Sequence, residues 1–279
     1  DQHVNSTDLL IVSKCANRDV VNDHRACSDS STFTPTPTSV PPTGTPVPPT
    51  ATATAVPSTL DLSHWKLTLP IGGPDEISPA ALVAGYSSSY FTPGAGTLTF
   101  WCPVTGVTTG GSSYPRSELR EEITGDMSNT NWLYPSFNST LSATLSVSQV
   151  PSTTKVIIGQ IHGVGNPLTK LVFDTANGGE IRADYRILPT DASAQPAVPI
   201  KTNIGPLGTS FSYTISLTST GVLSVQFGSE TPVVLETLSP GAAWSTEGLY
   251  FKAGDYVQDN VGTDTEGGQV TFTSLVVTH

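Results

Sequence analysis

Short stretches in which apolar and polar residues alternate recur between Leu60 and His279. The clearest examples are Thr97–Cys102, Leu141–Val147, Phe211–Leu217, Val222–Phe227 and Val270–Val277. Successive side chains of a β-strand point to opposite faces of a sheet, so this alternation predicts strands with one buried face. Gly221 lies in a turn between two of the stretches and predicts a hairpin. Because helical periodicity is nearly absent, the pattern predicts an all-β sandwich of antiparallel sheets.

A different kind of alternation occupies residues 250–258, where one face of the predicted strand is polar. Tyr250, Lys252, Gly254, Tyr256 and Gln258 share that face, and apolar residues dominate the other. The polar face offers two phenols, an ammonium and a carboxamide. Glycine in a strand often marks a close approach of another group to the backbone, so we expect room for a ligand at this glycine.

Two other predicted strands carry similar polar faces. Arg116, Glu118 and Arg120 share one face of the first strand, and Gln160 and His162 follow an apolar run in the second. Adjacent strands of a concave sheet would bring these groups together. Residues 180–186 also alternate, with charged side chains on one face. That face is interpreted either as an extension of the same groove or as a solvated surface of mutually compensating charges.

Composition and charge narrow the classes of function. The chain of 279 residues has 12 Lys and Arg against 23 Asp and Glu, a net charge of −11. This balance excludes a general binder of nucleic acids or anionic membranes. There is no run of about 18 apolar residues, which predicts no membrane-spanning helix. Only 13% of the residues are charged, and the many Ser and Thr residues are typical of a secreted β-protein.

The first 59 residues differ from the rest. Residues 1–32 form a short segment with Cys15 and Cys27, which is interpreted as a disordered extension or as a remnant module held by a disulfide. Residues 33–59 are rich in Thr and Pro and predict a semi-rigid linker. Residues 60–279 have the length of a single β-sandwich domain. Cys102 is expected to be a buried apolar residue rather than a reactive thiol. No signal peptide is expected in this numbering.

Three motifs in this order carry a family resemblance. R-S-E-L-R begins at Arg116, Q-I-H at Gln160, and Y-F-K-A-G-x-Y-x-Q at Tyr250. Together with residues 62–70, they resemble the alginate lyases of polysaccharide lyase family 7 over residues 60–279. The resemblance implies a β-jelly roll with a concave substrate groove. It also implies cleavage of alginate, a polymer of mannuronate and guluronate, to unsaturated oligosaccharides. Asp255 lies at a variable position of the third motif.

The chemistry of the motif residues suits β-elimination from a uronate polymer. The substrate carboxylate must be neutralised, a base must remove the C5 proton, and an acid must protonate the leaving oxygen. Arg116 and Gln160 can neutralise the carboxylate, while Tyr256 and His162 can exchange protons. The resemblance assigns these four residues to catalysis. The expected substrate-binding residues are Arg120, Glu118, Lys252, Gln258 and Tyr250, and Glu118 is expected to pair with a cation rather than to catalyse.

Several alternatives remain open on the sequence alone. They are a lyase acting on another uronan such as glucuronan, a lectin-like uronan-binding module without catalysis, and a glycoside hydrolase, which would need paired carboxylates.

No metal site or cofactor is expected, because no cluster of His, Cys and carboxylate residues has the spacing of metal ligands. Binding of the anionic polysaccharide should weaken at high salt. We expect a secreted, endo-acting monomer. In the family, an isoleucine at the position of Ile161, between Gln160 and His162, is associated with acceptance of guluronate-containing blocks.

Overall fold

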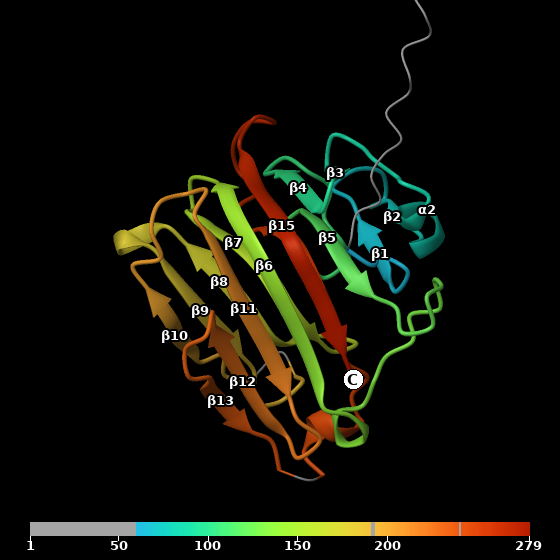
Figure 1. Cartoon of the computed structure of the whole chain (residues 1–279), viewed down its shortest axis with the longest axis vertical. Coiled ribbons are helices and arrows are strands. Elements are labelled where there is room, and N and C mark those ends of the chain that lie inside the picture. The colour runs from blue at the N-terminus through green and yellow to red at the C-terminus, as the bar shows by residue number, and fades with distance from the viewer. Residues whose placement is uncertain (1–59, 191–192, 240) are drawn as a thin grey trace, which may run out of the picture. The chain divides into compact units, whose positions relative to one another are not determined.

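The computed structural model describes residues 60–190, 193–239 and 241–279. The predictions for residues 1–32 and 33–59, including any pairing of Cys15 with Cys27, lie outside the described residues. The described part forms two antiparallel sheets that pack face to face (Figure 1). This arrangement confirms the predicted jelly-roll sandwich.

The first sheet, called the groove sheet here, contains eight strands in the order β10-β9-β8-β7-β14-β5-β1-β2. In that order the strands are β10 (Ala197–Thr202), β9 (Glu180–Tyr185), β8 (Pro167–Asp174), β7 (Lys155–His162), β14 (Tyr250–Val257), β5 (Arg116–Glu121), β1 (Trp65–Thr68) and β2 (Glu76–Ile77). The three strands that carry the sequence motifs, β7, β14 and β5, are therefore neighbours, as predicted.

The second sheet, called the back sheet here, contains seven strands in the order β13-β12-β11-β6-β15-β4-β3. In that order the strands are β13 (Val233–Thr237), β12 (Val222–Phe227), β11 (Ser210–Leu217), β6 (Ser139–Gln149), β15 (Gly267–Thr278), β4 (Thr97–Pro103) and β3 (Phe91–Gly94). The five stretches in which apolar and polar residues alternate, Thr97–Cys102, Leu141–Val147, Phe211–Leu217, Val222–Phe227 and Val270–Val277, all lie in this sheet. The predicted hairpin joins β11 to β12, and Gly221 in its turn has a positive φ of 88°.

Apolar side chains from both sheets meet in one core. From the back sheet, Phe100 and Phe272 pack edge to face with ring centroids 5.6 Å apart, and both are fully buried. From the groove sheet, Leu119, Phe251 and Ile161 enter the same core. Burying a side chain of this size contributes about 1.5–3 kcal/mol, so the core fixes which face of each strand points outward. The opposite face of the groove sheet is thereby left for polar side chains.

Helical structure is limited to one short α-helix and three 3₁₀ turns in the described ranges. The helix is α2 (Pro79–Val83), which begins after the Ser78 cap, and the turns are η1 (Tyr134–Ser136), η2 (Ala176–Gly178) and η3 (Ala243–Thr246). None of the helices in the described part has the length and apolarity to cross a bilayer.

The register of β14 changes at Gly254, and this changes the interpretation of that glycine. Its pairing with β7 shifts by one residue between Ala253 and Tyr256, which is a β-bulge, while its pairing with β5 stays continuous. Gly254 has a φ of 152°, and a Cβ atom there would lie 2.6 Å from the carbonyl oxygen of Ser117. The expectation of room for a ligand is therefore wrong, because the backbone of β5 occupies that space.

Candidate active site

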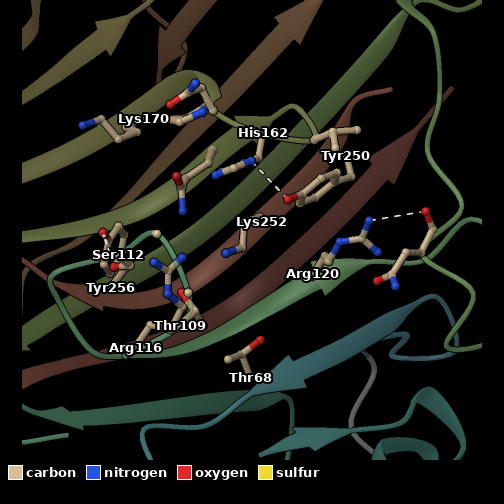
Figure 2. A pocket seen from close by; sticks show the side chains of 18 of the residues that line it. Thr68, Thr109, Ser112, Arg116, Arg120, His162, Lys170, Tyr250, Lys252 and Tyr256 are labelled. Carbon is tan, nitrogen blue, oxygen red and sulfur yellow. Dashed lines mark hydrogen bonds between the residues drawn. The ribbon is translucent and has the colours of Figure 1, made fainter. Parts of the chain in front are cut away.

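A groove of about 690 Å³ lies on the polar face of the groove sheet. Its lining residues come from β1, β2, β5, β14, β7 and β8, from Arg186 after β9, and from the loops at residues 109–112, 129–131 and 164–166. Arg116, Arg120, His162, Tyr250, Lys252 and Tyr256 all point toward one region (Figure 2). The structure thus brings together all four residues predicted to be catalytic, since Gln160 also lines the groove.

Cross-strand pairing arranges polar side chains in a row perpendicular to the strands. Lys66 pairs with Arg120, Arg120 with Lys252, Lys252 with Gln160, and Gln160 with Lys170. Adjacent strands are about 4.8 Å apart, so the row presents one hydrogen-bonding group at each strand spacing. A polymer with repeated carboxylates can contact such a row if it runs across the strands.

Glu118 lies beside this row, two residues before Arg120 on β5, and it is fully buried. Its carboxylate accepts hydrogen bonds from Lys252 Nζ at 2.6 Å, Arg116 Nη1 at 3.0 Å and Gln160 Nε2 at 2.5 Å. Burial alone raises the pKa of Glu118, but the charges of Lys252 and Arg116 outweigh it and hold the pKa below its ordinary value. One ionised carboxylate therefore fixes three groove residues.

The imidazole of His162 is neutral and has a defined tautomer. Burial, followed by the charge of Lys252, lowers the pKa of His162 to about 3, although the hydrogen bond to the Gly163 carbonyl opposes this. Nδ1 lies 2.6 Å from that carbonyl oxygen, which can only accept, so Nδ1 carries the proton. The lone pair of Nε2 is left free to accept a proton. Tyr250 stacks on the ring and places its hydroxyl 3.1 Å from Nδ1.

The phenol of Tyr256 is held by two neighbours. The guanidinium of Arg116 stacks over its ring, with Cζ 3.8 Å from the ring centroid. Its hydroxyl lies 3.0 Å from Ser112 Oγ. The Ser112 hydroxyl itself donates to the carbonyl of Tyr114 at 2.9 Å, so the phenol is the donor to Ser112. The loop that contains Ser112 thereby positions the proton of Tyr256.

One end of the groove is fixed by a second buried carboxylate, Glu122. It pairs with Arg120 and lies 3.7 Å from Lys66 Nζ. Arg120 also donates to Asn131 Oδ1 at 2.6 Å and stacks over the ring of Tyr250 at 3.9 Å. Arg120 and Lys66 are 8% and 3% exposed, so each presents only a small part of its surface to the groove.

The groove concentrates positive charge in an acidic protein. Nine Lys and Arg residues follow position 60, and six of them line the groove, namely Lys66, Arg116, Arg120, Lys170, Arg186 and Lys252. Glu76 is the one carboxylate among the lining residues of the described chain. The net charge of −11 is therefore compatible with an anionic ligand, because the cations gather at one place.

The structure departs from the predicted role of Gln258, limits that of Glu118, and favours one of the two interpretations of residues 180–186. Gln258 does not line the groove, and its amide donates to the neighbouring carbonyl of Val257, so its predicted contact with substrate does not fit this placement. Glu118 is too deeply buried to contact a ligand directly, and it pairs with cations as expected.

In residues 180–186, the charge of Arg182 is compensated by Asp174, Glu180 and Asp184, which favours the interpretation as a face of compensating charges. Arg186, in contrast, lines the groove.

Other lining residues were not found from the sequence. Ser112, Asn129, Asn131 and Lys170 lie in loops or in β8, outside the three motifs. Lys170 belongs to a strand that is mostly buried and does not alternate. Lys66 is a further lining residue that was not predicted. For this residue the sequence did carry a signal, because it lies in residues 62–70, which resemble the start of the family's domain.

Metal ligands and reactive thiols do not gather at this site. Within residues 60–190, 193–239 and 241–279, no group of three or more His, Cys, Asp or Glu side chains could hold a metal ion. Cys102 is a free, fully buried cysteine, as predicted. Burial and the nearby Asp255 raise the pKa of its thiol well above the ordinary value, which keeps it protonated.

Comparison with known proteins gives one consistent result. The model of the alginate lyase family matches residues 60–279. An alginate lyase of Klebsiella pneumoniae is 31% identical over 283 residues, which covers 81% of this chain and 92% of that protein. The crystal structure of an alginate lyase of Pseudomonas aeruginosa is 41% identical with a TM-score of 0.73, covering 78% of this chain and 99% of that chain.

A second structural relative was solved together with its ligands. Alginate lyase A1-II′, a member of polysaccharide lyase family 7, is 36% identical with a TM-score of 0.67, covering 79% of this chain and 96% of that chain. Variants of A1-II′ were solved in complex with a product, GGG, and with a substrate, GGMG.

Proposed function

Since the chain belongs to the alginate lyases of polysaccharide lyase family 7, we propose that its groove cleaves alginate by β-elimination with Arg116, Gln160, His162 and Tyr256 as the catalytic residues. The observation that carries this proposal is the convergence of these four side chains in one groove lined by cations, where Arg116 and Gln160 both donate to the ionised carboxylate of Glu118. The reaction gives oligosaccharides with an unsaturated uronate at the new end.

The first requirement of the reaction is to neutralise the substrate carboxylate. Arg116 donates to Glu118 through Nη1, which leaves other N–H groups of its guanidinium for the ligand. Gln160 uses one N–H of its amide on Glu118, so the second N–H is available to the substrate. Hydrogen bonds from these groups favour the anion that forms at C5, because they are already oriented before the substrate binds.

The second requirement is a proton acceptor and a proton donor. The free Nε2 of neutral His162 can take the C5 proton. The phenol of Tyr256, whose proton now points to Ser112, can turn that proton to the leaving oxygen. Where the C5 stereochemistry places the proton on the side of Tyr256, the phenolate would act as base, and the stacked Arg116 would stabilise its charge. The proton balance closes within these two side chains and solvent.

The arrangement favours elimination over hydrolysis. A glycoside hydrolase needs two carboxylates that flank the scissile bond. Glu118 is enclosed by Arg116, Lys252 and Gln160, and Glu76 lies at the β1 end of the groove, where it pairs with Lys66. Neither carboxylate has a partner across the catalytic centre among the described lining residues.

We also propose that the enzyme accepts guluronate-containing blocks, cleaves within the polymer, and acts as a secreted monomer. Ile161 supports the first point only indirectly, because its side chain is fully buried on the core face and cannot contact a sugar. Its size would act by setting the position of β7, which carries Gln160 and His162. The continuation of the lining from β1 to β8 supports internal cleavage, and the Thr/Pro-rich linker supports secretion.

Ultraviolet absorbance during incubation with alginate tests the reaction. Elimination leaves a C4=C5 double bond conjugated to the carboxylate, which absorbs, whereas hydrolysis leaves none. We expect a rising signal with the natural protein and a loss of at least about 100-fold with Tyr256→Phe, since a proton-transfer group is removed.

The other outcomes separate the alternatives. New reducing ends without absorbance would indicate a hydrolase and contradict the proposal. Binding without any product would indicate a lectin-like module. Absorbance with glucuronan but not with alginate would indicate that the substrate is another uronan. Comparison of initial rates on guluronate-rich and mannuronate-rich polymers tests the block preference, and strict mannuronate preference would contradict it.

A further inference from the structure

Two of the six groove cations, Lys170 and Arg186, differ from the other four. Lys66, Arg116, Arg120 and Lys252 each pair with a carboxylate, as described above. Neither Lys170 nor Arg186 has a carboxylate oxygen within 4.0 Å among the described residues. The charge at this end of the groove is therefore left uncompensated by the protein itself.

The position of Lys170 connects it directly to the catalytic residues. In the pairing of β8 with β7, Lys170 lies opposite Gln160, which donates to Glu118. Lys170 is thus about one strand spacing, ~4.8 Å, beyond Gln160 in the row of polar side chains. Figure 2 shows its ammonium on the same face as His162, on the side away from Arg116.

Arg186 is anchored immediately after β9. Its backbone N–H donates to Leu168 and its carbonyl accepts from the indole of Trp244 at 3.2 Å. Its Nη1 donates to the carbonyl of Thr190, while Nε is buried and has no hydrogen-bond partner. The side chain is therefore fixed by neutral groups, and its charge remains available.

The nearby acidic residues are already occupied by Arg182. Asp184 lies opposite Lys170 in the pairing of β8 with β9, but its carboxylate accepts from Arg182 Nε at 3.0 Å. Asp174 and Glu180 pair with the same guanidinium. Burial lowers the pKa of Lys170, with Asp184 opposing and Arg186 and Arg182 adding to the effect. An incoming anion would relieve this repulsion between cations.

We propose that Lys170 and Arg186 form a subsite for the carboxylate of a uronate residue beyond the one that is cleaved, at the β8 end of the groove. This inference rests on the proposed function, because it takes the ligand to be a uronate polymer. The subsite makes binding depend on the number of sugar residues, since only an oligosaccharide that reaches past Gln160 can contact it.

Affinity for oligosaccharides of increasing length tests the subsite without depending on turnover. Titration calorimetry in a Tyr256→Phe background, with alginate oligosaccharides of two to seven residues as probes, compares Lys170→Gln and Arg186→Gln with the parent. Loss of a charge-assisted hydrogen bond should weaken the long oligosaccharides roughly tenfold for each substitution. The shortest oligosaccharides that bind should change far less, and Lys170→Arg should restore the affinity.

Lys201→Gln is the matched control. It removes the same charge from β10, where Lys201 pairs with Glu230 outside the groove. An equal loss of affinity at all lengths, no loss at any length, or the same loss in the control would overturn the subsite. Failure of the proposed function would be seen separately, as the absence of an unsaturated product from the natural protein while the length dependence of binding persists.

Discussion

The two sheets of this sandwich follow different rules. In the back sheet, β6 alternates between buried and partly exposed residues, and its outward hydroxyls pair across strands, as Ser142 does with Thr214 at 2.9 Å. In the groove sheet, all six residues of β5 are buried, although four of them are charged. The back sheet shows how alternation alone builds a stable layer, whereas the groove sheet keeps charges in place through mutual compensation.

Removal of the carboxylate of Glu118 should have the largest effect on the contrast between the two sheets. Glu118→Gln keeps the shape of the side chain but leaves Arg116 and Lys252 buried without an anion. We expect a loss of about 3–5 kcal/mol in the free energy of unfolding and at least a 100-fold loss of activity. Chemical denaturation and the absorbance assay measure the two effects.

The control for Glu118 lies in the back sheet. Ser142→Ala removes one partner of an outward hydroxyl pair, and it should change stability by no more than about 0.5 kcal/mol and leave activity unaltered. If both substitutions had similar effects, the contrast between the two sheets would not hold.

Asp255 provides the next test of this contrast. It is an ionisable residue on the core face of β14, and no cation of the described chain compensates its charge. It is fully buried, and neither carboxyl oxygen has a hydrogen-bond partner. Burial, followed by the charge of Glu118, raises the pKa of Asp255 well above its ordinary value of 3.8. The folded protein therefore binds this proton more tightly than the unfolded chain does.

The sign of the pH dependence follows from this shift. The stabilising effect of the bound proton is complete below pH 3.8 and is lost as the pH rises toward the pKa of the folded state, by about 1.4 kcal/mol for each pH unit. Asp255→Asn removes this dependence, so we expect the variant to melt several degrees higher than the natural protein at neutral pH, with the gain disappearing near pH 4. Melting curves from pH 4 to 8 measure it. The exposed Asp264→Asn is the control, and parallel curves for natural protein and Asp255→Asn would contradict the prediction.

A pH profile of the reaction should sharpen the role of the compensated cations. Burial, followed by the charge of Arg116, lowers the pKa of Lys252 to about 8, with Glu118 opposing. The ammonium is charged below that pH and loses its charge above it. We expect kcat/KM for alginate to fall roughly tenfold as the pH rises through this range.

Lys252→Arg provides the comparison for that profile, because a guanidinium keeps its charge throughout the range. Its alkaline decline should move to higher pH, even if its rate at neutral pH is lower. An identical decline in both proteins would assign it to another group.

The smallest effect is expected at the loop that holds Tyr256. Ser112→Ala removes the acceptor of the phenol proton, and the loss of one neutral hydrogen bond should lower kcat about fivefold with little change in KM. Ser112→Thr should retain most of the activity. The adjacent, exposed Ser113→Ala is the matched control, and an equal decrease there would indicate a general effect on the loop.

Sequence reasoning was most successful where local rules decide the structure. Alternation located β4, β6, β11, β12 and β15 because each has one buried apolar face and one face that is mainly polar. It did not locate β8, which is mostly buried, so its residues show no period of two. Lys170 was missed for the same reason.

Within the site, the motifs identified the side chains but not their depth. Alternation placed Glu118 on the groove face, yet it cannot show that Arg116, Lys252 and Gln160 enclose it, because that depends on pairing with β14 and β7. Gly254 was misinterpreted because its bulge arises from those same pairings. Asp255 occupies a variable position of the motif, and only the packing against the back sheet shows that it is buried without a partner.

The row from Lys66 to Lys170 has a consequence for how recognition can change. Its spacing is set by backbone hydrogen bonds between strands, which are independent of the side chains. The sheet therefore keeps the positions of the row at a fixed spacing, while the side chain at each position can be replaced. In the proposed binding mode, a substitution at one position of the row changes the recognition of one sugar unit and leaves the other positions where they are, so a new preference is gained one position at a time.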